Sequence, residues 1–390
     1  MTVAYRHYEP SRLEPVLPSR TRQLEDLAVE LATLSGDLTR GLHPIVVQSI
    51  GTLVRSMNCY YSNLIEGHRT TPKDIERALA REFSSNPSQR DLQLEAIAHI
   101  EVQGKIDLDP SWQSISVVCP EFIQRIHCEF YERLPPRFWR LEQIEVIPGF
   151  LRETNVCIGR HVPPDPDTLP SFLTRFEKAY DPQRLSKIAR ILAAAASHHR
   201  LLWIHPFLDG NGRVARLFSH VYLQRIGIGN SLWSVSRGLA RQVQQYRVLL
   251  DGAERQRYND YDGRGNLTMA GLIEFCEFFF NTCIDQVRFM AQLLEPNQLL
   301  SRIEIYVERE VRERRLLRGS FPLLKAAFLN GSFRRGEAAI LTGYQEREAR
   351  LVLKQLLEVG LLNSDSPKAP VRLGFPVAAT DFWFPHLWNE

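Results

Sequence analysis

Apolar residues recur at steps of three and four along most of this chain, which is the period of an amphipathic helix. The clearest pattern spans residues 46–64, with Pro44 near its start and Gly67 after its end, both typical of helix boundaries. The same period predicts further helices over residues 22–34, 71–81, 90–103, 120–133, 169–179, 182–202, 212–226, 237–256 and 267–294. The pattern therefore predicts a mainly helical protein.

Three segments depart from this helical period. Residues 8–21 (YEPSRLEPVLPSRT) are rich in proline and predict an extended arm. Residues 144–159 (IEVIPGFLRETNVCIG) place β-branched residues around a polar centre, which predicts a short β-hairpin or flap. The next stretch, HVPPDPDTLP, contains four prolines and is expected to be an irregular loop, because prolines break helices.

The chain changes character after Glu295-Pro296-Asn297, which marks a natural boundary. Three short helices are predicted there, over residues 322–329, 335–341 and 344–359, followed by two short strands around the turn SPKAP. Helix, helix, turn, helix and wing is the order of a winged helix domain. The predicted parts are an N-terminal helical region (1–110), a core (111–295) and a winged helix-like domain (300–390).

Length, charge and cysteine usage limit the class of protein. A chain of 390 residues exceeds one ordinary core, so two or three domains are expected. The net charge of +3 gives no reason to expect general binding to nucleic acid or membranes. No apolar run approaches the ~18–20 residues that span a bilayer. The start MTVAYRHYEP lacks the apolar region of a secretion signal, and no C-x-x-C pair occurs, so a reducing cytoplasm is expected.

The segment WIHPFLDGNGRVAR, residues 203–216, carries most of the candidate chemistry. It joins two predicted helices, and its glycines permit positive φ and close approach to a ligand. The free N–H groups at the start of the second helix form an anion site. Arg213 and Arg216 are three residues apart and emerge on the same side of that helix's first turn. This arrangement predicts binding of several phosphate groups.

Asp209 and His205 add a metal site and a base to this loop. A carboxylate among cationic groups opposes phosphate binding unless a hard cation joins them, and Mg²⁺ is usually held by one or two carboxylates plus substrate phosphates. His205 is the side chain of the loop that can take up a proton near neutral pH. Taken singly, His205 would be an ordinary loop residue and Gly210–Gly212 an ordinary turn. Together, eight specified positions in twelve are far more specific than a lone GxGxxG.

The stretch His205-Pro-Phe-Leu-Asp-Gly-Asn-Gly-Arg213-x-x-Arg216 resembles the signature of the Fic family throughout. The resemblance implies a Fic-type helical core and transfer of AMP from ATP to a Ser, Thr or Tyr hydroxyl of a protein. It makes His205 the general base and Asp209 the Mg²⁺ ligand. The implied nucleotide- and phosphate-binding residues are Phe207, Gly210, Asn211, Gly212, Arg213 and Arg216. A phosphorylating branch of the family has Lys at the position of Gly212, so glycine here favours nucleotidyl transfer.

The segment RETNVCIG, residues 152–159, resembles the flap of this family, which holds the target protein as an added strand. The implied target-binding residues are Val156, Cys157, Ile158 and Gly159. Without the loop at His205, an ordinary surface hairpin would be the preferred interpretation. Tyr246 loosely matches a tyrosine that relatives carry near the nucleotide base. Since no motif that reads the base is found, ATP follows from the resemblance alone.

The segment Ser62-Asn-Leu-Ile-Glu66-Gly67 resembles the inhibitory signature of the family. Glu66 lies in the last turn of a predicted helix, where the helix dipole disfavours an acid by roughly a few tenths of a kcal/mol. The resemblance implies that the helix at about residues 45–67 is inhibitory, that Ser62 belongs to its signature, and that Glu66 pairs with Arg216 and blocks the γ-phosphate. Taken alone, Glu66 would be interpreted as a solvated residue at a frayed helix end.

The sequence therefore predicts an auto-inhibited, Mg²⁺-dependent protein adenylyltransferase that acts on an unknown target protein and on itself. The alternatives are removal of AMP by the same site, a DNA-binding regulator that senses a nucleotide, and a catalytically silent scaffold. DNA binding is not favoured, because seven basic and five acidic residues lie between Arg334 and Arg372. A homodimer is one expected assembly, since relatives use dimer contacts to control the inhibitory helix. The apolar tail FWFPHLW is expected to dock on the body, with partner binding as the alternative.

Overall fold

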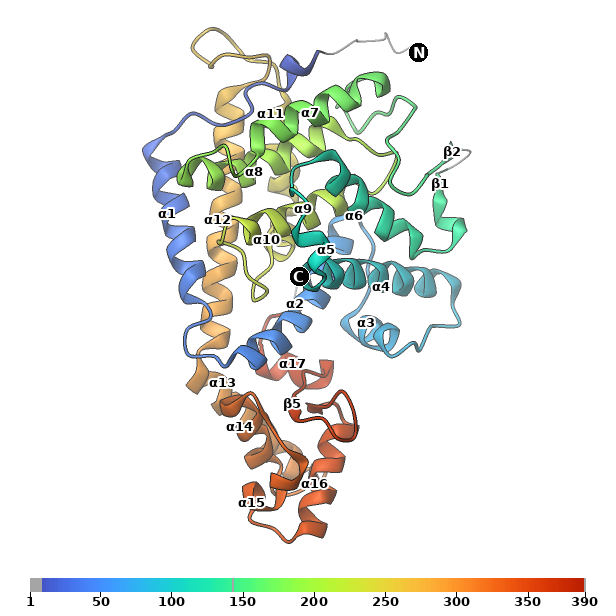
Figure 1. Ribbon diagram of the computed structural model, residues 1–390, viewed down its shortest axis with the longest axis vertical. Coiled ribbons are helices and arrows are strands. Elements are labelled where there is room, and N and C mark those ends of the chain that lie inside the picture. Colours follow the sequence, from blue (N-terminus) through green and yellow to red (C-terminus); the bar gives the residue numbers. More distant parts are fainter. Residues whose placement is uncertain (1–8, 142–143, 389–390) are drawn as a thin grey trace.

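The computed structural model describes residues 9–141 and 144–388. Most of the predicted start MTVAYRHYEP, and Tyr8 at the beginning of the predicted arm, lie outside the described residues. Figure 1 shows a helical body, with a smaller lobe formed by the last part of the chain below it. None of the described helices combines the length and the apolar character needed to cross a membrane.

The body consists of twelve described α-helices, as the helical period predicts. They are α1 (Arg22–Asp37), α2 (Pro44–Ile65), α3 (Pro72–Leu79), α4 (Pro87–Leu108), α5 (Pro110–Gln113), α6 (Pro120–Glu132), α7 (Leu169–Tyr180), α8 (Lys187–Ile204), α9 (Asn211–Arg225), α10 (Val235–Arg241), α11 (Val243–Glu254) and α12 (Met269–Leu294). The long helix α12 packs against α1, α8, α10 and α11. The two helices that flank the candidate loop, α8 and α9, pack against each other inside this frame.

Helix α2 has the boundaries that the sequence predicts. His43 precedes it, and the His43 ring accepts a hydrogen bond from the Ile45 N–H at 3.2 Å, while Pro44 occupies the first helical position. Gly67 has φ of 86°, and the N–H of Gly67 donates to the Leu64 carbonyl at 3.0 Å. A left-handed residue directly after a helix favours glycine, so the predicted stop at Gly67 is confirmed.

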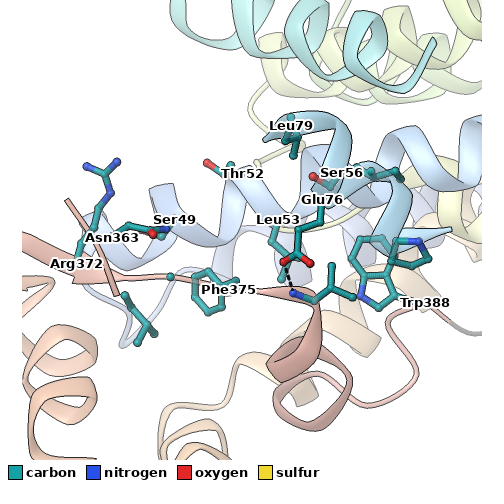
Figure 2. A pocket seen from close by; sticks show the side chains of 15 residues that line it. Ser49, Thr52, Leu53, Ser56, Glu76, Leu79, Asn363, Arg372, Phe375 and Trp388 are labelled. Carbon is teal, nitrogen blue, oxygen red and sulfur yellow. Dashed lines mark hydrogen bonds between the residues drawn. The ribbon is translucent and has the colours of Figure 1, made fainter. Parts of the chain in front are cut away.

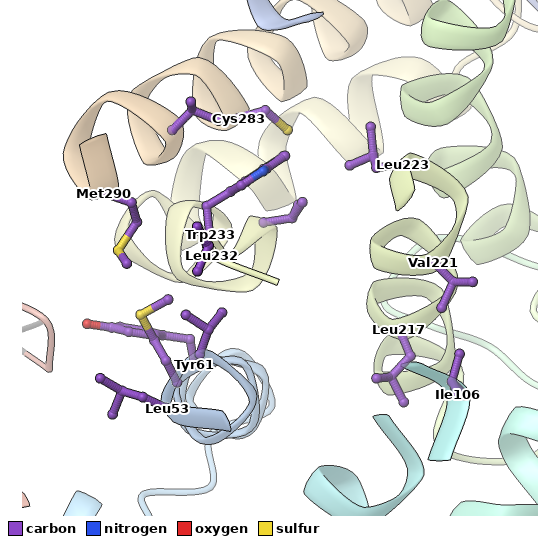
Figure 3. Close-up of a cluster of buried hydrophobic side chains, with 14 of the residues drawn as sticks. Leu53, Tyr61, Ile106, Leu217, Val221, Leu223, Leu232, Trp233, Cys283 and Met290 are labelled. Carbon is purple, nitrogen blue, oxygen red and sulfur yellow. The ribbon is translucent and has the colours of Figure 1, made fainter. Parts of the chain in front are cut away.

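One side of α2 lies in the hydrophobic core. Figure 3 shows Leu53 and Tyr61 of α2 in the same cluster as Trp233 and the α12 residues Cys283 and Met290. All of these side chains are buried. The packing fixes the rotation of α2, and therefore the direction in which its last turn presents side chains.

The lobe contains α13 (Pro296–Arg312), α14 (Ser320–Asn330), α15 (Ala338–Thr342), α16 (Glu346–Glu358) and α17 (Val377–Trp383). Its antiparallel sheet has the order β3 (Ser332–Phe333), β5 (Val371–Leu373) and β4 (Leu362–Asn363). The three predicted helices and the two strands of the wing are present, and the sequence reasoning missed β3 and α17. Assignment of this lobe to the winged helix class stays a prediction.

Two predictions of local structure are wrong in detail. The pattern over residues 237–256 predicts one helix, but the backbone breaks at Gln242 and separates α10 from α11. The hairpin predicted over residues 144–159 pairs only β1 (Arg140–Leu141) with β2 (Ile144–Glu145). Residues 146–157 form no described strand, because their backbone bonds instead to the candidate loop and to α6. The arm is mainly extended but includes a 3-10 turn, Pro10–Leu13.

Candidate active site

The loop within residues 203–216, which the sequence predicts to carry the chemistry, joins the end of α8 to the start of α9. His205 ends α8 in the left-handed conformation, with φ of 50°, which turns the chain out of the helix. Gly210 has φ of 78° and precedes the first residue of α9. A Cβ atom added at Gly210 would lie 3.0 Å from the Tyr131 ring, so both the backbone conformation and the available space favour glycine. The first-turn N–H groups of α9 therefore face the loop without a side-chain cap.

Arg152 attaches the predicted flap to this loop. Its Nε donates to the His205 carbonyl at 2.8 Å, and its backbone N–H donates to the Pro206 carbonyl at 2.9 Å. Arg152 Nη2 donates to the Pro164 carbonyl at 2.6 Å. Burial lowers the pKa of Arg152 to about 10, which still leaves the guanidinium charged at neutral pH. A buried arginine with carbonyl partners fixes the backbone that carries His205.

His127, on α6, supports the other side of the loop. Its ring stacks on Phe207 with the two centroids 4.0 Å apart. Nδ1 accepts a hydrogen bond from the Gly149 N–H at 2.9 Å, so Nε2 carries the proton and donates to the Asp209 carbonyl at 3.3 Å. Burial lowers the pKa of His127 to about 4, which keeps this tautomer neutral. Phe207, predicted to contact the nucleotide, is fully buried and serves here as a packing residue.

Asp209 and Asn211 are both held by hydrogen bonds. The Tyr131 hydroxyl donates to Asp209 Oδ2 at 2.6 Å, while Asp209 as a whole is exposed. The Asn211 side chain accepts from the Phe207 N–H at 2.9 Å and donates to the Phe207 carbonyl at 2.8 Å. The Asn211 amide therefore closes the loop on itself. Its predicted contact with phosphate would have to come from the backbone of α9, because the side chain is already used.

His205 is positioned to accept a proton. Burial, together with the neighbouring His161 and Arg152, lowers the pKa of His205 to about 4. The imidazole is therefore neutral at neutral pH, which is the form that a general base needs. His161 is held near His205 by a hydrogen bond. That bond joins His161 Nε2 to the Trp203 carbonyl at 2.7 Å.

Arg213 and Arg216, near the start of α9, have separate acidic partners. Arg213 donates to Glu95 Oε2 at 2.9 Å, and the same oxygen contacts His68 Nδ1 at 2.6 Å. Arg216 donates through Nε to the Ser62 hydroxyl at 2.9 Å and through Nη2 to Glu66 Oε1 at 2.5 Å. The sequence reasoning found Glu66 and Ser62 but missed Glu95.

Glu66 lies at the N-terminus of α9. A Cβ atom added at Gly212 would be 2.3 Å from Glu66 Oε1, so the carboxylate touches the first turn of that helix. Burial alone would raise the pKa of Glu66, but the charge of Arg216 and the hydrogen bond from it hold that pKa below its usual range. Arg247 of α11 donates to the Ile65 carbonyl at 3.0 Å and so fixes the last turn of α2. The carboxylate therefore lies beside the helix start at which the sequence predicts an anion site.

The predicted flap residues lie on an exposed turn. Ile158 and His161 form a two-way backbone bridge at 2.9 and 3.0 Å around Gly159, which has φ of 60°. Val156 is half-buried, whereas Cys157 and Ile158 are exposed. The predicted flap is thus a single tight turn rather than a short hairpin with paired strands.

Tyr246 is a core residue in this structure, and its contact with a nucleotide base stays a prediction. The side chain is 3% exposed, and its hydroxyl bonds to His198 Nε2 at 2.7 Å. His198 Nδ1 in turn contacts the Ser219 hydroxyl at 2.7 Å. This chain of buried hydrogen bonds assigns Tyr246 to the core beneath α9.

Comparison with known proteins agrees with the site. Residues 117–223 match the model of the Fic/DOC family. The protein adenylyltransferase Fic of Drosophila erecta is 39% identical over 79 residues, which are 20% of this chain and 16% of that protein. Its counterpart from Drosophila yakuba is 29% identical over 215 residues, 53% of this chain and 41% of that protein. The chain therefore spans less than half the length of these relatives.

Solved structures show the same fold. A Fic family protein from Desulfovibrio desulfuricans G20 is 16% identical, with a TM-score of 0.53 over 91% of this chain and 97% of that one. Fic-1 from C. elegans is 16% identical, with a TM-score of 0.54 over 70% of this chain and 73% of that one. Residues 117–223 are thus similar to the Fic/DOC family, and the helical body has the fold of these Fic structures.

Proposed function

We propose that this chain is an auto-inhibited protein adenylyltransferase that transfers AMP from ATP to a Ser, Thr or Tyr hydroxyl of a target protein or of the chain itself. The observation that carries the proposal is a neutral His205 in the loop before α9, a helix whose first turns carry the buried Arg213 and Arg216. That combination offers a base for a hydroxyl and a cradle for a polyphosphate. The names of the Drosophila relatives describe the same activity.

The reaction needs one bond to form and one to break. The target hydroxyl oxygen attacks the α-phosphorus of ATP, and His205 accepts the hydroxyl proton. The bond between the α-phosphorus and the oxygen bridging to the β-phosphate breaks, and pyrophosphate leaves. The N-terminus of α9 and Arg213 stabilise the charge on the phosphates. Gly212 leaves no side chain between this helix end and the nucleotide, as expected for nucleotidyl rather than phosphoryl transfer.

The donor set suits Mg²⁺ bound to a nucleotide. The described residues contain no group of three or more His, Cys, Asp or Glu side chains that could hold a metal. Mg²⁺ needs no such cage, because it is commonly held by one or two carboxylates, water and substrate phosphates. Asp209 is exposed, and Tyr131 orients its carboxylate. Asp209 would therefore hold the ion, which would neutralise phosphate charge.

Glu66 supplies the inhibition. Its carboxylate occupies the anion site at α9 and pairs with Arg216, so it competes with the outermost phosphate of ATP for the same charges. A regulator that binds DNA is not proposed, because two of the three basic residues of α16 are paired with glutamates of the same helix. Arg350 contacts Glu346 at 2.8 Å and Lys354 contacts Glu358 at 3.6 Å.

Label transfer from ATP with Mg²⁺ tests the proposal, using α-labelled and γ-labelled ATP in parallel. The wild type is compared with Glu66→Gly and with Glu66→Gly combined with His205→Ala. Label from the α position only, rising in Glu66→Gly and falling by at least about 100-fold without His205, is the expected result. Label from the γ position would mean phosphoryl transfer. Absence of label in every variant, with cell lysate added as target, would refute adenylyl transfer.

A matched assay with an AMP-modified target distinguishes the reverse reaction. Removal of AMP that requires Glu66 would show that this carboxylate orients a water molecule rather than inhibits. Under the proposal, Glu66→Gly increases the amount of modified target and removes no AMP.

A further inference from the structure

The last described residues of the chain, 384–388, pack against α2. This is the helix that contains Ser62 and is followed directly by Glu66. We call these five residues the tail segment. The Tyr61 hydroxyl donates to the Leu387 carbonyl at 2.8 Å. The Trp388 ring meets the Tyr60 ring edge to face, with centroids 5.7 Å apart. Phe384, Leu387 and Trp388 are all buried. The predicted docking of the apolar tail on the body is therefore observed.

A buried arginine of the body attaches the tail segment from a second direction. Arg237 of α10 donates to the His386 carbonyl at 2.8 Å and to the Gln286 side chain at 2.8 Å. Its guanidinium also lies 3.7 Å from the centre of the Phe289 ring. Displacing the tail segment would leave a buried guanidinium and the Tyr61 hydroxyl short of partners, which is unfavourable. The tail segment is thus held specifically, through its backbone carbonyls.

The position of this contact matters for Glu66. Tyr61 is the residue before Ser62 and lies five residues before Glu66, so all three belong to the last two turns of α2. Ser62 and Glu66 bind Arg216 on one side of the helix, while Tyr61 binds the tail segment on another. A shift or rotation of these turns would change both contacts together.

The face of α2 that meets the C-terminal part of the chain borders a cavity. A cavity of about 200 Å³ lies between α2, α3 and the lobe. Figure 2 shows Leu53 and Ser56 of α2 facing it, with Phe375 and Trp388 of the C-terminal part of the chain on the opposite wall. Trp388 of the tail segment is therefore part of the wall that this cavity shares with α2.

We infer that the tail segment regulates the active site by holding the last turns of α2 in the pose that places Glu66 on Arg216. Displacement of residues 384–388 then releases Glu66 and raises transfer of AMP. This inference rests on the proposed function, and it adds a second element, distant in sequence, to the control of that site.

Removal of single contacts tests this inference. Tyr61→Phe deletes the hydroxyl that binds Leu387 and that also interacts with Arg237. Trp388→Ala deletes the ring on Tyr60, together with its hydrogen bond to Thr380. The matched control is Tyr180→Phe, which deletes another buried hydroxyl that donates to a backbone carbonyl, that of Val16 at 2.6 Å. The rate of AMP transfer should rise about fivefold in Tyr61→Phe, as expected for one lost hydrogen bond, and should not change in the control. In a Glu66→Gly background, neither variant should increase the rate further.

Hydrogen exchange of the α2 amides provides a readout that does not depend on catalysis. Exchange at residues 60–66 should be faster in Tyr61→Phe and Trp388→Ala than in Tyr180→Phe. Unchanged exchange and an unchanged transfer rate in a folded Tyr61→Phe protein would overturn the inference. So would equal activation in the Glu66→Gly background. If Glu66→Gly itself gains no activity, the proposed auto-inhibition fails, and the exchange experiment still decides whether the tail segment holds α2.

Discussion

Arg213 and Arg216 lie one helical turn apart on α9 and are both buried, yet their acidic partners differ in kind. Glu95, the partner of Arg213, comes from the middle of α4, and both side chains of this pair are 8% exposed. Glu66, the partner of Arg216, comes from the end of α2, and its side chain is 35% exposed. The first pair is part of the core, whereas the second has one partner at the surface.

This difference suits the two ion pairs to different roles: the Glu95–Arg213 pair stabilises the fold, and the Glu66–Arg216 pair suits regulation. A buried charge that loses its partner is strongly destabilising, so Glu95 must stay with Arg213 for the fold to persist. The partly exposed carboxylate of Glu66 can be solvated at little cost when it leaves, and the buried Arg216 keeps the hydroxyl and the carbonyl of Ser62 as partners. Of the two arginines, only Arg216 is therefore suited to exchange its protein partner for a phosphate of the nucleotide.

The largest effect is expected when the buried pair of Glu95 and Arg213 is broken. Glu95→Gln should lower the free energy of unfolding by about 3 kcal/mol, because it leaves Arg213 charged and buried without its carboxylate. The control Glu66→Gln should lower it by less than about 1 kcal/mol, because water reaches that carboxylate. Denaturant unfolding of the two variants measures the difference. Equal losses would contradict the distinction between the pairs.

A smaller effect is expected when a methyl group fills the space between Glu66 and α9. Gly212→Ala would place a methyl group 2.3 Å from Glu66 Oε1 and should destabilise the wild type by about 2 kcal/mol. In a Glu66→Gly background the same substitution should cost much less, because its nearest neighbour is gone. A double-mutant cycle on thermal unfolding measures this coupling. Additive losses would show that Glu66 does not occupy the helix end in solution.

The hydrogen bond that orients Asp209 should have an effect of about 1 kcal/mol. Tyr131→Phe, made in the Glu66→Gly background, is expected to slow AMP transfer about fivefold and to weaken the dependence on Mg²⁺. Tyr222→Phe is the control, because Tyr222 also donates from the core but to a backbone carbonyl, that of Tyr180 at 2.9 Å, rather than to a carboxylate. A rate unchanged by Tyr131→Phe would remove Asp209 orientation from the mechanism.

The smallest expected effect is on the pH dependence of inhibition. The pKa of Glu66 is held below its usual range, so its contact with Arg216 is intact above that range and is lost only as pH falls through the lowered value. His205 stays neutral down to its pKa of about 4. The ratio of transfer rates between Glu66→Gln and wild type should therefore stay constant from pH 8 to about pH 5. A ratio that falls toward one between pH 7 and pH 6 would contradict this.

Much of the candidate site could be predicted from the sequence because its residues lie in two short segments. His205, Asp209 and Arg216 fall within one loop and helix start, where spacing alone places them together. The stop at Gly67 is equally local, since a left-handed residue after a helix selects glycine. Ser62 and Glu66 are one helical turn apart, so their common direction also follows from the sequence.

The partners that hold this loop could not be predicted in the same way. Arg152, His127, Tyr131 and Glu95 are each separated from the loop by dozens of residues, and nothing in their local pattern marks them as polar groups inside the core. The boundary of the flap was also wrong, because the backbone of Arg152 bonds to Pro206 instead of to a neighbouring strand.

The sequence by itself determined the helical class, the candidate loop at residues 203–216, and the acid that faces it, because each depends on residues close together along the chain. The tertiary structure decided which acid belongs to which arginine, that Tyr246 lies in the core, and that the C-terminal tail segment binds Tyr61. The physical reason is that burial and hydrogen bonding between distant segments depend on how the helices pack, and helical periodicity specifies an apolar face without specifying its partner.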